Sequence, residues 1–198
     1  MRVARDSTAA RIRRENAPLV LPDIIAKGLS VVFCGINPGL TAATSGHHFS
    51  SPSNRFWRVL HLAGFTPIQI LPENDRSLLD YGYGLTTAVA RATRSADELA
   101  ANEFVQAAAA LENKIARYAP RAIAFLGKPA YSAITGRPLI QWGVQAMAFG
   151  GASTWVLPNP SGLNRSFRTE DLVAAYHELR LSVKMPASGK RGEPRRKT

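Results

Sequence analysis

The sequence predicts a three-layer α/β/α sandwich around a central, mainly parallel β-sheet, and three observations support this fold class. Short apolar runs rich in β-branched residues alternate with segments of helical periodicity. Two runs, 30–36 and 121–126, are apolar almost throughout, which is typical of strands buried on both faces of a parallel sheet. The chain of 198 residues is 45% hydrophobic and 20% charged, which is ordinary for one globular domain.

The first half of the chain predicts two strands and two helices. The run 30–36 predicts a buried strand, and the Gly, Pro, Ser and Thr residues of 37–53 predict a loop. Segment 54–65 predicts a helix that ends at Gly64. The helical spacing places four of its apolar residues on one face: Phe56, Trp57, Leu60 and Ala63. A short helix over 75–81 and a short strand over 85–89 follow.

The second half continues the alternation of helices and strands. Ser95 and Glu98 have the spacing of a capping box, so the Ala-rich stretch from Ser95 to Tyr118 predicts a long helix that Pro120 ends. The remaining expected elements are a strand at 121–126, a helix at 129–134, strands at 146–149 and 153–157, and a final helix at 169–182.

The formal net charge of +11 lies mostly at the two ends of the chain. Residues 1–14 carry five arginines and one aspartate, and residues 184–198 carry six basic residues and one glutamate. We therefore expect a basic tail at 1–17, one folded domain at 18–183 and a basic tail at 184–198. Such tails either serve as solvated ends or add non-specific affinity for DNA phosphates, and we favour the second interpretation.

Several classes of protein are excluded by composition. No stretch approaches the roughly 18 consecutive apolar residues of a membrane span, and the Arg-rich start lacks the apolar core of a secretory signal. The single cysteine, Cys34, forms no internal disulfide and no thiolate metal site by itself. We expect a monomeric, cytoplasmic protein without contact to a membrane.

The same dipeptide follows two of the expected strands. Asn37-Pro38-Gly39 comes after 30–36, and Asn159-Pro160-Ser161-Gly162 comes after 153–157. Because ligands of open α/β sheets bind at the carboxyl ends of strands, we expect both turns to line one crevice. Asn-Pro is also a common turn initiator, so either loop taken alone is better explained as a simple turn, and its occurrence after two strands weakens that explanation.

The residues around these turns resemble a known family. The segment GINPGLTAATSGHHFSSPSNRFWRVL (35–60) and the segment NPSGLNR (159–165) resemble the mismatch-specific uracil-DNA glycosylase and thymine-DNA glycosylase family. Supporting segments are TTAVARATRSADEL, LGKPAY and QWG, so the resemblance covers about residues 28–182. It implies a uracil-DNA glycosylase fold and a monofunctional glycosylase that flips uracil out of mismatches with guanine, hydrolyses its N-glycosidic bond and leaves an abasic site.

The resemblance also assigns roles at the first turn. Asn37 would orient the attacking water, while backbone N–H groups near Ile36 and Phe49 would stabilise the departing base. The Phe49 ring would stack on the flipped pyrimidine, although a loop aromatic that plugs the core is the simpler alternative. The same pocket would include three further residues: Ala42 near the pyrimidine C5 position, His48 and Asn159. The Ala42 and His47-His48 pattern is closer to the thymine-processing branch, which predicts some activity on thymine.

At the second turn, the resemblance implies contacts with duplex DNA. Leu163 would be the wedge that fills the space left by the flipped base. Gly162 and Asn164 would lie against the widowed guanine, and Arg165 would contact a phosphate. Many bacterial relatives carry serine at position 164. The alternative for Leu163 is an ordinary leucine that anchors the loop.

The expected partner is double-stranded DNA with G:U or related mismatches in a bacterial nucleoid, and no cofactor or metal is expected. One rival function is a non-catalytic module of the same fold that binds mismatches or abasic sites. A phosphate-binding enzyme of another class is disfavoured, because GINPGL lacks the terminal Gly-Lys-Ser/Thr of a Walker motif. We interpret Cys34 as a core residue, His47 and His48 as loop residues without a metal, and Lys128 as packing at a helix start rather than as a Schiff-base lysine.

Overall fold

The computed structural model describes residues 20–184 and confirms the three-layer fold class. Of the two basic tails expected at 1–17 and 184–198, only Lys184 falls within this range. Four strands are parallel: β1 (Val31–Gly35), β2 (Tyr83–Thr87), β3 (Ala122–Leu126) and β5 (Ser153–Leu157). The short β4 (Gly143–Val144) pairs antiparallel with β5, and the strand order is β2-β1-β3-β5-β4.

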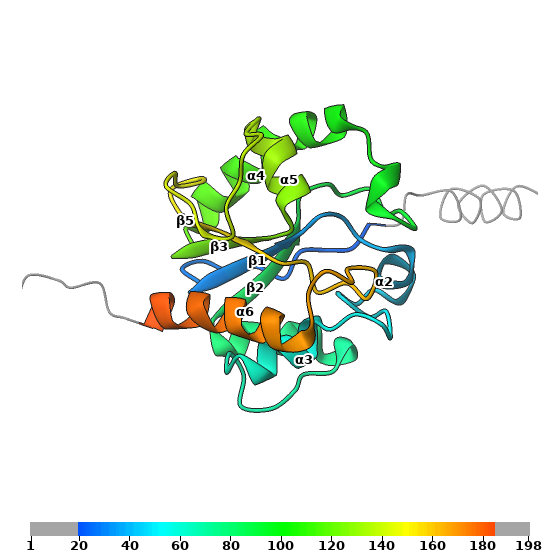
Figure 1. Cartoon of the computed structure of the whole chain (residues 1–198), viewed down its shortest axis with the longest axis vertical. Helices are drawn as coiled ribbons and strands as arrows, with labels where there is room; N and C mark the ends of the chain where they lie inside the picture. The colour runs from blue at the N-terminus through cyan, green and yellow to red at the C-terminus, as the bar shows by residue number, and fades with distance from the viewer. Residues whose placement is uncertain (1–19, 185–198) are drawn as a thin grey trace, which may run out of the picture.

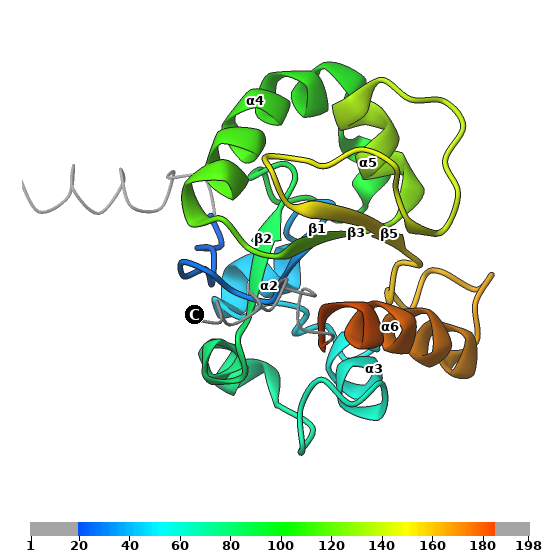
Figure 2. The same cartoon turned by 90° about the vertical axis from the view of Figure 1, so that its left-hand side faces the viewer.

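Helices cover both faces of the sheet. Figures 1 and 2 show α4 (Ala101–Tyr118) and α5 (Lys128–Thr135) on one side, with α3 (Phe56–Leu62) and α6 (Thr169–Lys184) on the other. Each side has its own apolar core, one around Phe33, Phe56 and Tyr176 and the other around Phe125, Tyr131 and Ile115. The central strands β1 and β3 are buried along their whole length, as parallel strands between two helical layers must be.

Several predicted elements are confirmed. The four apolar residues proposed for one face of α3 are all buried, and the Asn54 side chain accepts a hydrogen bond from the Phe56 N–H at the start of that helix. Helix α4 ends at Tyr118, and its C-cap Ala119 directly precedes Pro120. Cys34 is fully buried, and desolvation raises the pKa of its thiol, as expected for a core residue.

Three predictions were wrong in the first half of the chain. The expected loop 37–53 contains a helix, α2 (Leu40–Ser45), whose buried residues are only Ala42 and Ala43. The expected helix 75–81 is a longer 3-10 segment, η1 (Pro72–Tyr81), which the proline at its first position opens. Strand β2 lies two residues earlier than predicted, since its pairing with β1 begins at Tyr83.

Two further predictions were wrong in the second half. The Ser95–Glu98 capping box closes only a short 3-10 turn, η2 (Ala96–Glu98), and α4 begins later with its own Glu103 bond to the Ala100 N–H. Segment 146–149 is no strand: only Phe149 forms an isolated bridge, with Ala152, while the edge pairing is made by β4. Within residues 20–184, no helix is both long and apolar enough to cross a membrane.

Candidate active site

The two Asn-Pro turns lie at the carboxyl edge of the same sheet, as predicted. They follow β1 and β5, which are separated only by β3. Gly127, directly after β3, brings them together: a Cβ atom added there would lie 3.7 Å from the Asn159 Cβ and 3.8 Å from the Ile36 Cδ1. Gly127 has φ +121°, a conformation that side chains disfavour. The end of β3 is therefore the floor over which the two loops meet.

The Asn37 side chain is held by its nitrogen. Its Nδ2 donates to the Arg91 carbonyl at 2.8 Å and to the Thr93 Oγ1 at 2.7 Å. The Thr93 hydroxyl proton is already used on the Ser95 carbonyl, so Oγ1 is an acceptor towards Asn37. Within residues 20–184, nothing donates to the Asn37 Oδ1. Asn37 thus presents a fixed, free acceptor oxygen at the edge of the sheet.

The segment that holds Asn37 is itself anchored to α4. The Arg91 guanidinium forms two 2.8 Å hydrogen bonds with the Glu103 carboxylate and a third bond with the Glu98 carbonyl. The side-chain hydrogen bond from Arg91, together with the Ala100 N–H, lowers the pKa of Glu103 to about 2. Glu103 therefore remains ionised at any physiological pH, and the Arg91 carbonyl remains in place for Asn37.

Asn159 is held in the opposite sense. Its Oδ1 accepts the Ser161 N–H at 2.9 Å, which fixes the amide orientation because a backbone N–H can only donate. Its Nδ2 donates to nothing in the described part of the chain. The site therefore offers an acceptor from Asn37 and a donor from Asn159, both from neutral amides.

Phe49 adopts an unusual backbone conformation beside β1. Its φ of +53° is uncommon for a residue with a bulky side chain. The ring stacks on Phe56 with centroids 4.0 Å apart and lies 3.7 Å from a Cβ added at Gly35. Neither the Phe49 N–H nor the Ile36 N–H donates a hydrogen bond to residues 20–184. Both predicted donors are consequently free for a ligand.

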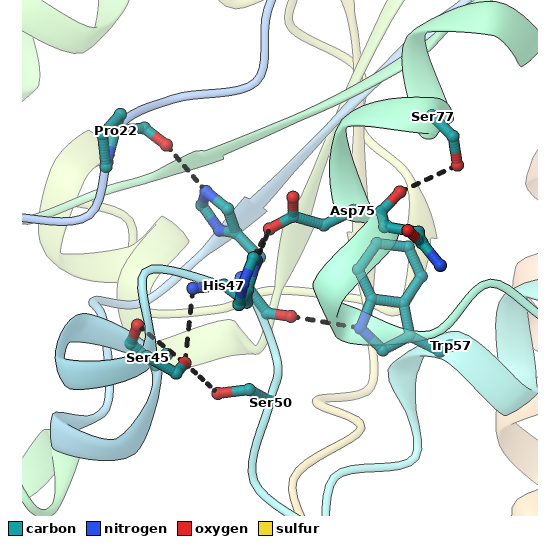
Figure 3. Close-up of polar contacts among 10 residues, drawn as sticks. Pro22, Ser45, His47, Ser50, Trp57, Asp75 and Ser77 are labelled. Carbon is teal, nitrogen blue, oxygen red and sulfur yellow. Dashed lines mark hydrogen bonds and ion pairs between the residues drawn. The ribbon is translucent and has the colours of Figure 1, made fainter.

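A buried carboxylate fixes the loop that carries Phe49. Asp75, 3% exposed, accepts the His48 N–H at 2.9 Å and lies 3.7 Å from the His47 Nδ1. The Trp57 indole donates to the His48 carbonyl, so the loop is held on both sides, and Figure 3 shows Asp75 and Trp57 converging on it. These fixed contacts maintain the strained Phe49 backbone.

The His48 side chain is buried and bonds to neither Asn-Pro turn. Its imidazole bonds to the Pro22 carbonyl, and desolvation lowers its pKa, so the ring is neutral near pH 7. A cavity of about 310 Å³ lies on this side, bounded by His47, His48 and Asp75. The lining of this cavity includes neither Asn37 nor Asn159, so the cavity is separate from the two Asn-Pro turns.

The loop after β5 presents Leu163 at its tip. The Leu163 side chain is 78% exposed, and Arg165 is also exposed. Gly162 packs so closely on Ser53 that an added Cβ would lie 2.6 Å from the Ser53 Cβ and carbonyl oxygen. The Asn164 side chain is engaged within the loop, because its Nδ2 donates to the Asn159 carbonyl and its Oδ1 accepts the Ser166 N–H. The exposed tip is thus an apolar side chain on a well-bonded turn.

The remaining predicted residues lie around this edge. Ala42 is buried on α2. Lys128 is the first residue of α5, and its ammonium lies 4.5 Å from the centre of the Trp142 ring, so it packs on an aromatic ring instead of standing free as a nucleophile. No group of three or more metal-binding side chains occurs among residues 20–184.

Sequence reasoning missed the residues that hold the loops. The contacts that orient the two turns are made by Thr93, Arg91, Asp75 and Arg55. Arg55 stands in the quoted segment 35–60, and Arg91 and Thr93 stand in TTAVARATRSADEL, but the resemblance assigned no role to these residues. The pairing of these residues depends on tertiary structure, and no spacing in the sequence predicts it.

The fold and the site define an α/β protein whose ligand site is built from loops at the carboxyl edge of its sheet. A family model described as the uracil DNA glycosylase superfamily matches residues 22–180. A solution NMR structure from Methanosarcina acetivorans, described as a candidate uracil DNA glycosylase, is similar in fold. It has 21% sequence identity and a TM-score of 0.56, and the match covers 81% of this chain and 97% of that chain.

The chain belongs to the uracil DNA glycosylase superfamily. Membership makes it a DNA glycosylase of base excision repair, which is a hydrolase of N-glycosidic bonds with DNA as its substrate.

Proposed function

We propose that this protein is a monofunctional glycosylase that removes uracil from mismatches with guanine in double-stranded DNA and leaves an abasic site. The observation that carries the proposal is the opposite orientation of two neutral amides, with the Asn37 oxygen free and the Asn159 nitrogen free. Hydrolysis of a glycosidic bond needs an acceptor for the attacking water and a donor for the base that departs as an anion. The two turns supply one of each.

The first step is the placement of water. The Asn37 Oδ1 accepts a hydrogen bond from a water molecule and directs its oxygen at C1′ of the flipped nucleotide. The bond from C1′ to N1 of uracil breaks, its electron pair leaves with the base, and the water proton passes to solvent. Because a neutral amide removes no proton efficiently, positioning accounts for most of the contribution of Asn37, and turnover is slow.

The second step is the stabilisation of the uracil anion. The free Asn159 Nδ2 and the unpaired N–H groups of Ile36 and Phe49 are donors for the uracil carbonyl oxygens. Such donors are effective when they are preorganised, because they cost no reorganisation during the reaction. The Phe49 ring, already stacked on Phe56 on one side, supports the pyrimidine by stacking, with Ala42 on α2 towards its C5 position.

Recognition of the mismatch belongs to the loop after β5. Leu163 enters the space left by the flipped nucleotide, and Arg165 meets a phosphate. The Asn164 amide is engaged within the loop, so the backbone of Gly162 and Leu163 contacts the widowed guanine. Neither the Gly162 carbonyl nor the Leu163 carbonyl accepts a hydrogen bond within residues 20–184, and guanine offers N–H donors on its pairing edge. A weaker pair opposite guanine lowers the cost of flipping, which favours G:U and, to a lesser degree, G:T.

One panel of substrates tests the proposal. The protein is incubated with G:U, A:U and G:T duplexes and with single-stranded uracil DNA in the presence of a chelator, and abasic sites are revealed by alkali. We expect strand breaks only after alkali, with G:U the best substrate. Binding to G:U or abasic duplexes without release of any base would instead identify a non-catalytic binding module, and equal rates on A:U and G:U would overturn the mismatch preference.

A further inference from the structure

Arg55 joins the start of α3 to the loop after β5. Below, the loop after β1 (37–53) is called the first loop and the loop after β5 (160–167) is called the second loop. Arg55 is the residue before α3, half-buried, and its backbone N–H donates to the Pro160 carbonyl at 3.0 Å. Its side chain reaches under the 160–167 turn. The first and second loops are therefore connected through one residue that the mechanism above leaves without a role.

The Arg55 guanidinium is surrounded by backbone carbonyls. Nη1 donates to Phe167 at 2.8 Å, and Nη2 donates to Asn164 at 2.9 Å and Ser161 at 3.1 Å. Nε adds a longer bond of 3.4 Å to Pro160. Among residues 20–184, Arg55 makes no ion pair with a carboxylate. Four of its five N–H donors are thus used to hold the shape of one loop.

The carbonyl groups that bond to Arg55 determine which residues of the loop are exposed to solvent. With Ser161 and Asn164 turned towards Arg55, the Gly162-Leu163 tip faces solvent, and Leu163 remains 78% exposed. The Leu163 N–H is also fixed, on the Ser161 Oγ. The loop that carries this exposed apolar side chain is therefore preorganised. DNA binding then does not have to order the loop.

We propose that Arg55 is a positioning residue that presets the 160–167 loop for insertion of Leu163 into duplex DNA. This inference rests on the proposed function. Arg55 acts through Leu163 and does not itself contact a phosphate, since four of its five N–H donors already bond to carbonyls of the loop. Lysine cannot replace it, because a single ammonium does not span carbonyls that converge from several directions.

The first test compares substrates for Arg55→Ala. We expect single-turnover base release from G:U duplexes to fall about 10- to 100-fold, because several charge-assisted bonds are lost. Release from uracil within an unpaired bubble, where no wedge is needed, should change far less. Arg55→Lys should recover only part of the duplex rate. The matched control is Arg58→Ala, since Arg58 is an exposed residue of the same helix and should leave both rates unchanged.

The second test is a double-mutant cycle with Leu163→Ala. If Arg55 acts through Leu163, the double variant should be no slower on G:U duplexes than the slower single variant. Additive losses, or equal losses on duplex and bubble, would overturn the inference. Should Arg55→Ala fail to fold, as judged by thermal unfolding, Arg55→Lys carries the same cycle.

A third measurement is independent of activity. Amide hydrogen exchange at Leu163 and Asn164 should accelerate in Arg55→Ala, while exchange in the sheet stays unchanged. Unchanged exchange at the loop would contradict the inference even if activity fell. A wild-type protein that releases no base from any duplex contradicts the proposed function instead, and the exchange measurement still decides whether Arg55 holds the loop.

Discussion

The loops after β1 and β5 begin with the same dipeptide but are stabilised in opposite ways. The loop after β1 is held mainly by acceptors: Asp75 receives the His48 N–H and the Arg91 carbonyl receives the Asn37 amide, while the Trp57 indole is a donor to the His48 carbonyl. The loop after β5 is held by a donor, the Arg55 guanidinium, beneath an exposed tip. The first arrangement leaves an acceptor oxygen at the site, and the second leaves an apolar side chain outside it.

This difference shows that a motif residue is given its chemical role by its neighbours. Asn37 and Asn159 are the same residue in the same turn context, yet one exposes oxygen and the other exposes nitrogen. An amide can serve as donor or acceptor, and fixed partners on one end decide which function remains. The variants below separate the two loops by changing one partner at a time.

The largest expected effect is at Asn37. Asn37→Ala removes the water acceptor, and we expect kcat on G:U duplexes to fall about 100- to 1,000-fold, as for loss of one preorganised polar group. Binding of uncleaved G:U duplex, measured by fluorescence anisotropy, should be nearly unchanged because the second loop is intact. Asn113→Ala, on the exposed face of α4, is the matched control. A variant that cleaves at the wild-type rate would remove Asn37 from the mechanism.

Gly162→Ala should have the next largest effect, and it acts where the loop after β5 packs on Ser53 of the loop after β1. The new Cβ meets Ser53 at 2.6 Å, so the loop must shift by an amount that typically costs about 1–3 kcal/mol. We expect slower single-turnover release from duplexes and little change on an unpaired bubble. Gly39→Ala is the control in the first loop, because a Cβ there meets nothing within 4 Å. Equal effects of the two substitutions would contradict the packing argument.

The sequence predicted the strands and helices better than the side-chain contacts that hold the loops in place. The strands around Phe33 and Ala124 are apolar over their whole length, so their burial and parallel pairing could be inferred directly. Helix α2 was missed because its buried residues are alanines, which give no strong periodicity. Segment 146–149 is apolar, but Gly150 and Gly151 turn the chain before it can pair as a strand.

The candidate site was predictable only where a motif carried it. The resemblance assigned roles to Asn37 and Leu163, but none to Thr93, which is 56 residues from the amide that it holds. The sequence does not show which end of an amide is already bonded. It also predicted a guanine contact for the Asn164 side chain, which the structure engages within its own loop instead. The contact with guanine therefore stays a prediction only for the backbone of Gly162 and Leu163.

Thr93→Val tests the orientation of Asn37 with a smaller effect. Valine keeps the volume of this buried residue and removes one of two acceptors for Nδ2, a loss worth about 0.5–1.5 kcal/mol, or roughly two- to tenfold in kcat. KM should not change, because the contact holds the water acceptor and not the DNA. Thr93→Ser keeps the hydroxyl and should restore the rate. A Val variant with normal kcat would show that the Arg91 carbonyl alone is sufficient to orient the Asn37 amide.

The smallest expected effect is the pH dependence that His48 gives to the first loop. Burial lowers the pKa of its imidazole in the folded protein, whereas the unfolded chain has the ordinary value of about 6.5. Above that pH both states are neutral and the stabilisation is complete. As the pH falls through 6.5, the unfolded state binds the proton first, so the free energy of unfolding decreases until the folded pKa is passed.

Denaturant unfolding at pH 8, 6.5 and 5 measures this dependence. His48→Asn should flatten the decline between pH 8 and 5, while His47→Asn, at the more exposed neighbouring residue, should leave the contribution of His48 in place. The second loop contains no histidine, so protonation of His48 should affect Leu163 only indirectly. If His48→Asn keeps the full decline, other groups control the acid sensitivity, and the two loops differ in their partners but not in their response to pH.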